Sequence, residues 1–196
     1  MEEKELKTEQ HPLEPFFPFG AQVLMMGSFP PPKSRWVMDF YYPNFQNDMW
    51  RIMGLVFFND KEHFLSRDRK TFCEKRIREF LTEKGIALTD SGREIIRQKD
   101  NASDKFLEIV RTIDLPSVLR QLTSCKAIVT TGQKATDTLL SLVEAEQPRV
   151  GGFSVFLFEG REIRIYRMPS SSRAYPKPLP EKAEVYRGMF RELGLV

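Results

Sequence analysis

A short apolar run that ends at glycine and proline constrains the fold of this chain most strongly. The run is Val23-Leu24-Met25-Met26, and Gly27 and then Pro30-Pro31-Pro32 follow it closely. Consecutive apolar residues bounded by such breakers indicate a buried strand, and the prolines exclude a helix directly after it. Open α/β sheets bind their ligands outside the carboxyl ends of the strands. We therefore expect the loop after Met26 to line a ligand site.

The segment between this loop and the next helix has the composition of a pocket wall. Phe40-Tyr41-Tyr42 offers aromatic surface for stacking, and Asn44 and Asn47 offer amide groups. From position 47 onward apolar residues recur at helical spacing, so Asn47 or Asp48 is expected at the start of a helix, where both residue types are favoured as caps. Asn47 therefore has a structural interpretation beside a catalytic one.

The rest of the chain alternates between helical and extended patterns. Helical spacing indicates helices near residues 73–81, 104–110, 114–122, 135–143 and 181–190, and apolar runs indicate strands near residues 86–88, 127–130, 153–158 and 162–168. The last two strands form a hairpin around Glu159-Gly160. This alternation predicts an α/β fold, a three-layer α/β/α sandwich with a central, mostly parallel sheet, to which the hairpin adds an antiparallel strand.

The length of the chain suits a single domain over residues 1–196. One core of this size buries about 70% of the surface of the unfolded chain. A hydrophobic fraction of 41% and a charged fraction of 29% are typical of a soluble globular protein. Pro12, Pro15 and Pro18 break any helix near the N-terminus, so we expect residues 1–20 to form a loosely ordered N-terminal arm with little chemistry.

Composition also narrows the classes of function. No apolar run approaches the ~18 residues that a membrane span needs, and residues 1–10 are charged and polar, so we expect an intracellular protein. The two cysteines and two histidines show no spacing typical of a zinc site or a disulfide framework, and we expect no metal and no cofactor. The net charge of +3 is too small to indicate a nucleic-acid partner alone. A basic stretch at residues 161–177 fits either such a partner or a solvated strand face.

Three stretches of the chain combine into a recognisable set of motifs. The first is Gly27-Ser28-Phe29-Pro30 with Tyr41-Tyr42 and Asn47-Asp48-Met49-Trp50, the second is Gly85–Asp90 with Asp104 and Thr131–Ala135, and the third is Met168-Pro169-Ser170-Ser171-Ser172-Arg173-Ala174. Together they resemble the uracil-DNA glycosylase superfamily, especially its mismatch-specific and hypoxanthine-DNA glycosylase-like branches. The resemblance extends over residues 23–175, and the first motif is the most specific.

The resemblance implies a role for each motif residue. Asn47 would orient a water toward C1′ of the sugar, Gly27 and Ser28 would donate backbone N–H groups to a base carbonyl, and Tyr42 would stack on the base. In the third motif the implied DNA-binding residues are Ser170, Ser171, Ser172 and Arg173, the serines at phosphates and Arg173 at the backbone or in the vacated base stack. Met49 and Trp50 are interpreted as core residues of the helix that fixes Asn47.

The activity implied by the resemblance is that of a monofunctional DNA glycosylase. Such an enzyme flips a base out of the duplex and hydrolyses its N-glycosidic bond, which leaves an abasic site for base excision repair and needs no metal. The implied base is deaminated, uracil or hypoxanthine, and the implied partner is DNA with a damaged or mispaired base. We expect a cytoplasmic, nucleoid-associated monomer.

The motifs also differ from the family pattern. Pro43-Asn44-Phe45 stands where the hypoxanthine-like branch tends to show Ala-His-Pro, and Arg173 stands where it tends to show proline. Base preference is therefore left open. The alternatives are a non-catalytic nucleic-acid-binding protein of the same fold, which would bind DNA with strong salt dependence, and an α/β protein that acts on a free nucleotide.

Overall fold

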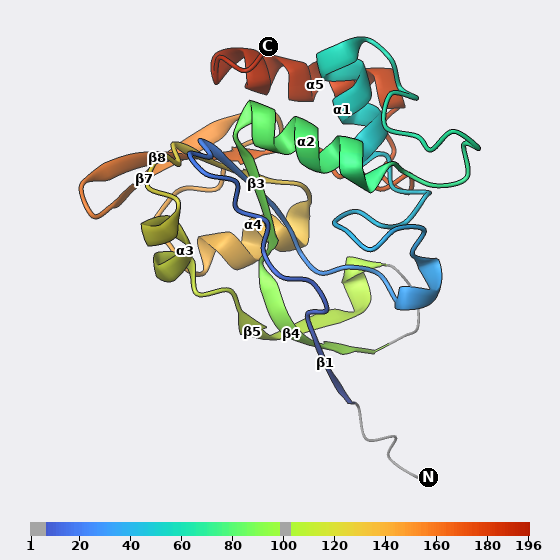
Figure 1. The fold of residues 1–196 in the computed structure, drawn as a ribbon. Coiled ribbons are helices and arrows are strands. Elements are labelled where there is room, and N and C mark those ends of the chain that lie inside the picture. The colour runs from blue at the N-terminus through green and yellow to red at the C-terminus, as the bar shows by residue number, and fades with distance from the viewer. Residues whose placement is uncertain (1–6, 99–102) are drawn as a thin grey trace, which may run out of the picture.

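A five-stranded, mostly parallel sheet forms the centre of the computed structural model, which describes residues 7–98 and 103–196 (Figure 1). The strand order is β3-β2-β6-β8-β7. β2 is parallel to β3 and β6, β6 is parallel to β8, and only the edge strand β7 is antiparallel to its neighbour. The strands are β2 (Val23–Gly27), β3 (Ile86–Asp90), β6 (Ala127–Thr130), β7 (Phe153–Phe158) and β8 (Arg161–Arg167). The predicted sheet and its antiparallel hairpin strand are confirmed.

Helices cover both faces of this sheet. Alternate residues of β2 divide between two cores, because successive side chains of a strand point to opposite faces. Val23 and Met25 belong to the core under α1, α2 and α5, whereas Leu24 and Met26 belong to the core under α3 and α4. Figure 1 shows these two groups of helices on opposite sides of the sheet. The helices are α1 (Met49–Phe58), α2 (Glu74–Lys84), α3 (Leu115–Gln121), α4 (Gln133–Leu140) and α5 (Leu179–Glu192). The predicted three-layer α/β/α sandwich is confirmed.

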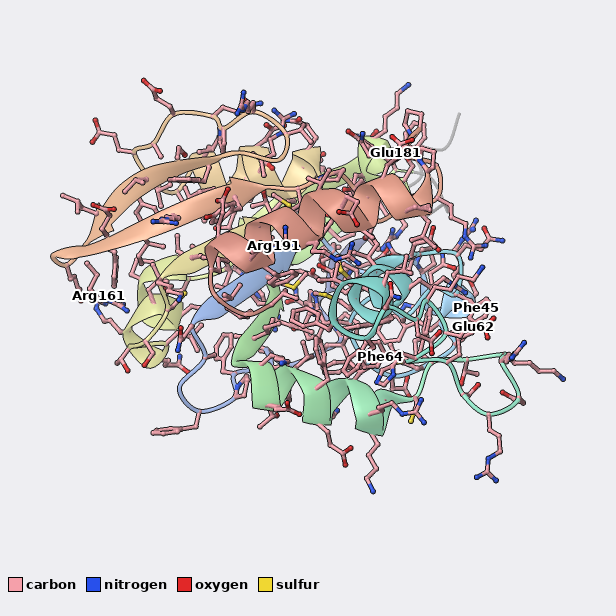
Figure 2. The ribbon with its side chains drawn as sticks, turned by 90° about the horizontal axis from the view of Figure 1, so that it is seen from above. Phe45, Glu62, Phe64, Arg161, Glu181 and Arg191 are labelled. Carbon is pink, nitrogen blue, oxygen red and sulfur yellow. The ribbon has the colours of Figure 1, made fainter. Side chains whose placement is uncertain are left out.

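The α1, α2 and α5 face has an aromatic core. The loop between α1 and α2 inserts Phe64, whose ring lies 6.2 Å from the ring of Trp50 and 5.1 Å from that of Phe80. Met49 and Trp50 are almost completely buried in this core, as predicted. Figure 2 shows α5 crossing the same face from Glu181 toward Arg191. α1 is therefore held on the sheet by packing along its length, and its N-terminus is fixed at the carboxyl edge of the strands.

A second, three-stranded antiparallel sheet was not predicted. Its strands are β1 (Thr8–Gln10), β4 (Gly92–Arg97) and β5 (Leu107–Thr112), in the order β1-β4-β5. The helix predicted over residues 104–110 is wrong: a short 3₁₀ turn at Asp104–Phe106 leads into β5. The apolar residues there satisfy helical spacing and strand alternation equally, and pairing with β4 decides in favour of the strand.

The N-terminal segment is more ordered than predicted for a loose arm. Residues 8–10 pair with β4, and Phe16 exchanges two backbone hydrogen bonds with Leu88 of β3, at N···O distances of 2.9 and 2.8 Å. Between these two attachments His11 is buried. The described part of the arm thus belongs to the folded domain and reaches the carboxyl end of β3.

Candidate functional site

A cavity of about 550 Å³ opens at the carboxyl ends of the central strands. The structure brings together in it every residue singled out from the sequence: Gly27, Ser28, Tyr42, Asn47, Ser170, Ser171, Ser172 and Arg173. Asp90, Asp104 and Thr131 line it as well. The cavity lies where parallel strands of an open α/β sheet are expected to place a ligand.

Gly27 and Asp90 meet at the base of the cavity. A Cβ atom at Gly27 would lie 2.6 Å from Oδ1 of Asp90 and 3.5 Å from the hydroxyl of Tyr42. The first distance is far inside van der Waals contact, so a side chain at position 27 would displace the carboxylate. Glycine at the end of β2 therefore leaves room for the Asp90 side chain at the end of the neighbouring β3.

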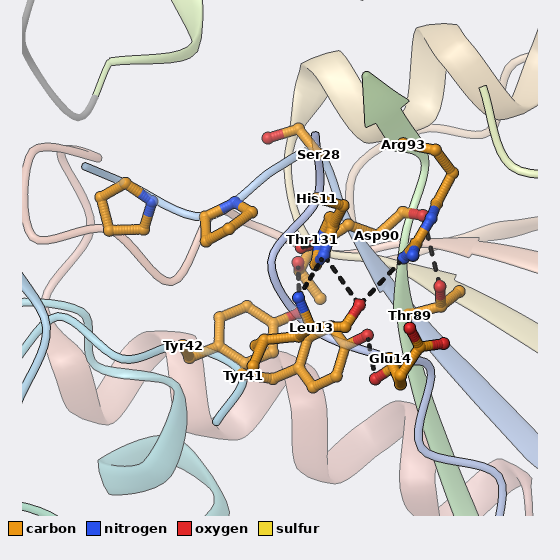
Figure 3. Close-up of polar contacts among 12 residues, drawn as sticks. His11, Leu13, Glu14, Ser28, Tyr41, Tyr42, Thr89, Asp90, Arg93 and Thr131 are labelled. Atoms are coloured by element: carbon orange, nitrogen blue, oxygen red, sulfur yellow. Dashed lines mark hydrogen bonds and ion pairs between the residues drawn. The ribbon is translucent and has the colours of Figure 1, made fainter. Parts of the chain in front are cut away.

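His11 holds the carboxylate of Asp90 in place. Its Nε2 lies 2.7 Å from Oδ2 of Asp90, and both side chains are buried (Figure 3). Nδ1 of His11 lies 3.0 Å from the carbonyl oxygen of Leu13 and 3.1 Å from its backbone nitrogen, so either protonation state of the ring has a partner. Within the described chain, Oδ1 of Asp90 has no hydrogen-bond partner. That oxygen is an available acceptor in the cavity.

The ring of Tyr42 is fixed as a wall of the cavity. Its backbone has a φ of 53°, in the left-handed region that bulky residues rarely adopt. The hydroxyl lies 2.9 Å from Oγ1 of Thr131 (Figure 3), and the ring meets that of Trp50 edge to face at 5.9 Å. Burial, together with the charge of Asp90, holds the pKa of Tyr42 well above its ordinary value. Tyr42 is therefore a neutral phenol at physiological pH.

Asn47 has a structural contact in addition to its place in the cavity. Its Oδ1 accepts a hydrogen bond from the backbone N–H of Met49 at 3.0 Å, in the first turn of α1. The N-cap position of α1 is held by Asp48, which makes no side-chain cap, and Asn47 precedes it and binds the first helical N–H through its side chain. One lone pair of the amide oxygen is occupied by this bond. The second lone pair and the amide NH₂ group remain for a ligand.

Ser28 is coupled to Asp104, which comes from the turn before β5. The Ser28 hydroxyl donates to Oδ1 of Asp104 at 2.8 Å. Burial raises the pKa of the Asp104 carboxyl, while the bond from Ser28 lowers it and the charge of Asp90 raises it further. Two carboxyl groups, of Asp90 and Asp104, thus line one cavity, and the buried His11 contacts Asp90 without lining the cavity.

The serine-rich loop is joined to the start of α1. The backbone N–H of Asp48 donates to the carbonyl of Ser171 at 2.9 Å, and Asn47 and Ser172 form an antiparallel bridge. Nε of Arg173 donates to Oδ1 of Asp48 at 3.1 Å, although half of the Arg173 side chain is exposed. The first and third motifs, distant in sequence, therefore form one rigid wall of the cavity.

Sequence reasoning did not assign a site role to His11, Asp90 or Asp104. For Asp90 a usable signal exists, because it ends a strand at the same edge of the sheet as Gly27. His11 gives no such signal, since it meets Asp90 only through the path of the N-terminal segment. Asp104 reaches Ser28 through the second sheet, which was itself unpredicted.

Comparison with known proteins gives a likeness in fold. No protein-family model and no curated protein matches the sequence. A solution NMR structure from Methanosarcina acetivorans, described as a "putative Uracil DNA glycosylase", matches with a TM-score of 0.61 and 20% identity. The match covers 94% of this chain and 99% of that one. The two chains share a fold.

The cavity lies at the carboxyl edge of the central sheet of this fold. In residues 7–98 and 103–196 no helix combines the length and the apolar character needed to cross a membrane. Over the same residues, no group of three or more His, Cys, Asp or Glu side chains is arranged to bind a metal ion. The residues that line the cavity present amide, hydroxyl, carboxylate and aromatic groups to it.

Proposed function

We propose that the protein is a monofunctional DNA glycosylase that removes a deaminated base, uracil or hypoxanthine, and leaves an abasic site. The observation that carries the proposal is the convergence of the first motif and the serine-rich loop on one cavity. An enzyme that acts on a base in DNA needs a pocket for the flipped base and a clamp for the phosphates beside it. The likeness in fold to a protein described as a glycosylase supports the proposal.

The cavity offers a pocket suited to a deaminated base. The ring of Tyr42 provides a stacking surface, and Asp90 provides an acceptor at Oδ1. Uracil carries a ring N–H at N3 and hypoxanthine carries one at N1, whereas cytosine and adenine have a lone pair at those positions. A carboxylate oxygen accepts a hydrogen bond from the ring N–H of uracil or hypoxanthine and repels the lone pair on the ring nitrogen of cytosine or adenine.

The reaction creates a negative charge on the base and a positive charge on the sugar, and the cavity has groups placed for each. Breaking the N-glycosidic bond places negative charge on the departing base and positive charge on the sugar. Backbone N–H groups of Gly27 and Ser28 would stabilise the base anion. The amide of Asn47 would hold a water against C1′ without removing a proton, because an amide does not titrate near neutral pH.

The proposal is tested with a panel of oligonucleotides. Single-stranded and duplex DNA containing uracil, hypoxanthine or a thymine mispair is incubated with the protein and then treated with alkali to cut at abasic sites. We expect strand cleavage for uracil or hypoxanthine and none for unmodified DNA. Absence of cleavage in every context would refute the proposal.

One observation favours the alternative of a non-catalytic DNA-binding protein. The side-chain amide oxygen of Asn47, which is expected to orient the water, already accepts a hydrogen bond from the backbone N–H of Met49. If this bond prevents water activation, the cavity still binds a flipped nucleotide without cutting it. The same panel separates the two functions, because this alternative binds DNA with strong salt dependence and leaves every base in place.

A further inference from the structure

Helix α5 contains a lysine that is almost completely buried. Lys182 is 1% exposed, and its Nζ donates to the carbonyl oxygen of Ser172 at 2.7 Å. No carboxylate of the described chain lies within ion-pair distance of this ammonium group. A buried charge is costly unless it is paired. Lys182 therefore needs an explanation other than its contribution to the stability of the core.

The surroundings of Lys182 carry a surplus of positive charge. Asp48 is the carboxylate of this cluster, and it accepts from Arg51 at 3.2 Å and from Arg173 at 3.1 Å. Two arginines thus pair with one carboxylate, and the ammonium group of Lys182 lies beside them at the carbonyl oxygen of Ser172 without an ion pair of its own among the described residues. Burial lowers the pKa of Lys182, Asp48 raises it in part, and Arg173 lowers it further. An anion that approaches this loop from outside would relieve the imbalance.

Three backbone carbonyl oxygens of the serine-rich loop accept hydrogen bonds from other parts of the protein. The carbonyl of Pro169 accepts from the hydroxyl of Tyr186 at 2.9 Å, and that of Ser171 accepts from the backbone N–H of Asp48 at 2.9 Å. The carbonyl of Ser172 accepts from Lys182 and, at 3.1 Å, from the backbone N–H of Tyr175. Carbonyl oxygens facing a phosphate would repel it. Because interior donors bind these oxygens, the loop can present hydroxyl groups and the Arg173 guanidinium to an anion.

We propose that Lys182 is a positioning residue that holds the loop of residues 170–173 in its phosphate-binding conformation and places positive charge beneath it. The ligand class is the phosphodiester group of a nucleic-acid backbone, and this identification rests on the proposed function. Lys182 acts through the Ser172 carbonyl and does not touch the DNA. Through the bridge between Ser172 and Asn47, it also fixes the serine-rich loop against the start of α1.

The test compares Lys182→Met, Lys182→Arg and a control at an exposed lysine that makes the same kind of carbonyl contact. Lys126 also donates its Nζ to a backbone carbonyl, that of Leu193 at 3.0 Å, but it precedes β6 at the opposite edge of the sheet, so Lys126→Met is the control. Binding of a fluorescent duplex without any modified base is followed by anisotropy over a range of salt concentrations. This readout does not depend on turnover.

We expect Lys182→Met to bind the duplex about tenfold more weakly and to reduce the slope of log K against log salt by about one. Its midpoint of thermal unfolding should be unchanged or higher, because the substitution removes a buried charge. Lys182→Arg should restore most of the affinity, and Lys126→Met should bind like the wild type.

Three outcomes would overturn the inference. In the first, Lys182→Met binds the duplex with the affinity and the salt dependence of the wild type. In the second, Lys182→Met and Lys126→Met lose affinity and stability to the same extent. In the third, the wild type does not bind the duplex. The proposed function can fail while this inference holds. In that case the wild type binds DNA in a Lys182-dependent manner and releases no base. Release of a base together with an unaffected Lys182→Met variant would refute the inference alone.

Discussion

At the scale of single residues, the site depends on side chains that have two contacts each. Asn47 contributes to the first turn of α1 and lines the cavity. Asp90 accepts from His11 with one oxygen and leaves the other free. Such dual use means that a substitution can change stability and activity together. Each test at this scale therefore needs a variant that preserves the structural contact.

Asn47 is the residue whose replacement should affect base release most. Asn47→Ala removes both the amide and the acceptor for the Met49 N–H, so we expect at least a hundredfold loss of base release and about 1 kcal/mol lower free energy of unfolding. Asn47→Ser keeps an acceptor for the backbone. It should retain stability yet lose base release. Wild-type activity in Asn47→Ser, measured in single-turnover assays, would refute the catalytic assignment.

Asp104 should make stability depend on pH. Its carboxyl pKa is raised in the folded state by burial, so the folded protein binds more protons than the unfolded chain above pH ~4, and stability falls as pH rises through the raised pKa. Asp104→Asn removes this cost and keeps an acceptor for Ser28. We expect the variant to melt at a higher temperature than the wild type at pH 8, with a difference that shrinks as the pH falls toward the ordinary carboxyl pKa of about 4. A difference that grows as the pH falls would contradict this origin.

At the scale of elements, the second sheet supports the cavity from outside the sandwich. Arg97 of β4 forms a bidentate ion pair with Glu9 of β1, at 3.0 and 3.2 Å, and donates to the carbonyl of Pro30 at 3.0 Å. Pro30 belongs to the loop that carries Gly27 and Ser28. β1 is therefore linked to the cavity loop by the Arg97 side chain, which contacts both Glu9 and Pro30.

Deleting residues 1–10 should expose that dependence. The deletion removes the pairing of β1 with β4 and the ion pair of Glu9 with the nearly buried Arg97. We expect a lower thermal midpoint and weaker base release, since loss of one partner of a buried pair is destabilising. Deletion of residues 1–6 keeps Glu9 and is the control. Equal behaviour of both deletions and the wild type would show that β1 does not support the site.

The parallel strands β2, β3 and β6 were predictable because they are apolar runs, and β7 and β8 because a Glu-Gly turn joins them as a hairpin. β2 is buried along its whole length, and its pattern in the sequence needs no partner to be recognised. β4 and β5 are different, because half-buried strands with charged residues such as Arg93 and Glu94 take their structure from pairing with each other. The pairing of β1 with β4 joins residues distant in sequence, which local periodicity does not report.

At the scale of the whole molecule, the topology assembles the site. Loops that follow β2, β3, β6 and β8 meet at one edge of the sheet, so motifs separated by more than a hundred residues line one cavity. This convergence could be predicted from the alternation of strands and helices. The burial of His11 against Asp90 and of Lys182 beneath the serine-rich loop could not, because both follow from how terminal elements pack on the sheet.

The most direct measurement is the identification of the reaction product. Wild-type protein and Asn47→Ser are incubated with a duplex that contains one uracil or one hypoxanthine, and the released free base is quantified by mass spectrometry. A monofunctional glycosylase releases one free base for each abasic site formed, and Asn47→Ser releases none. Wild-type protein that binds both duplexes and releases no free base from either would contradict base excision as the function of this cavity.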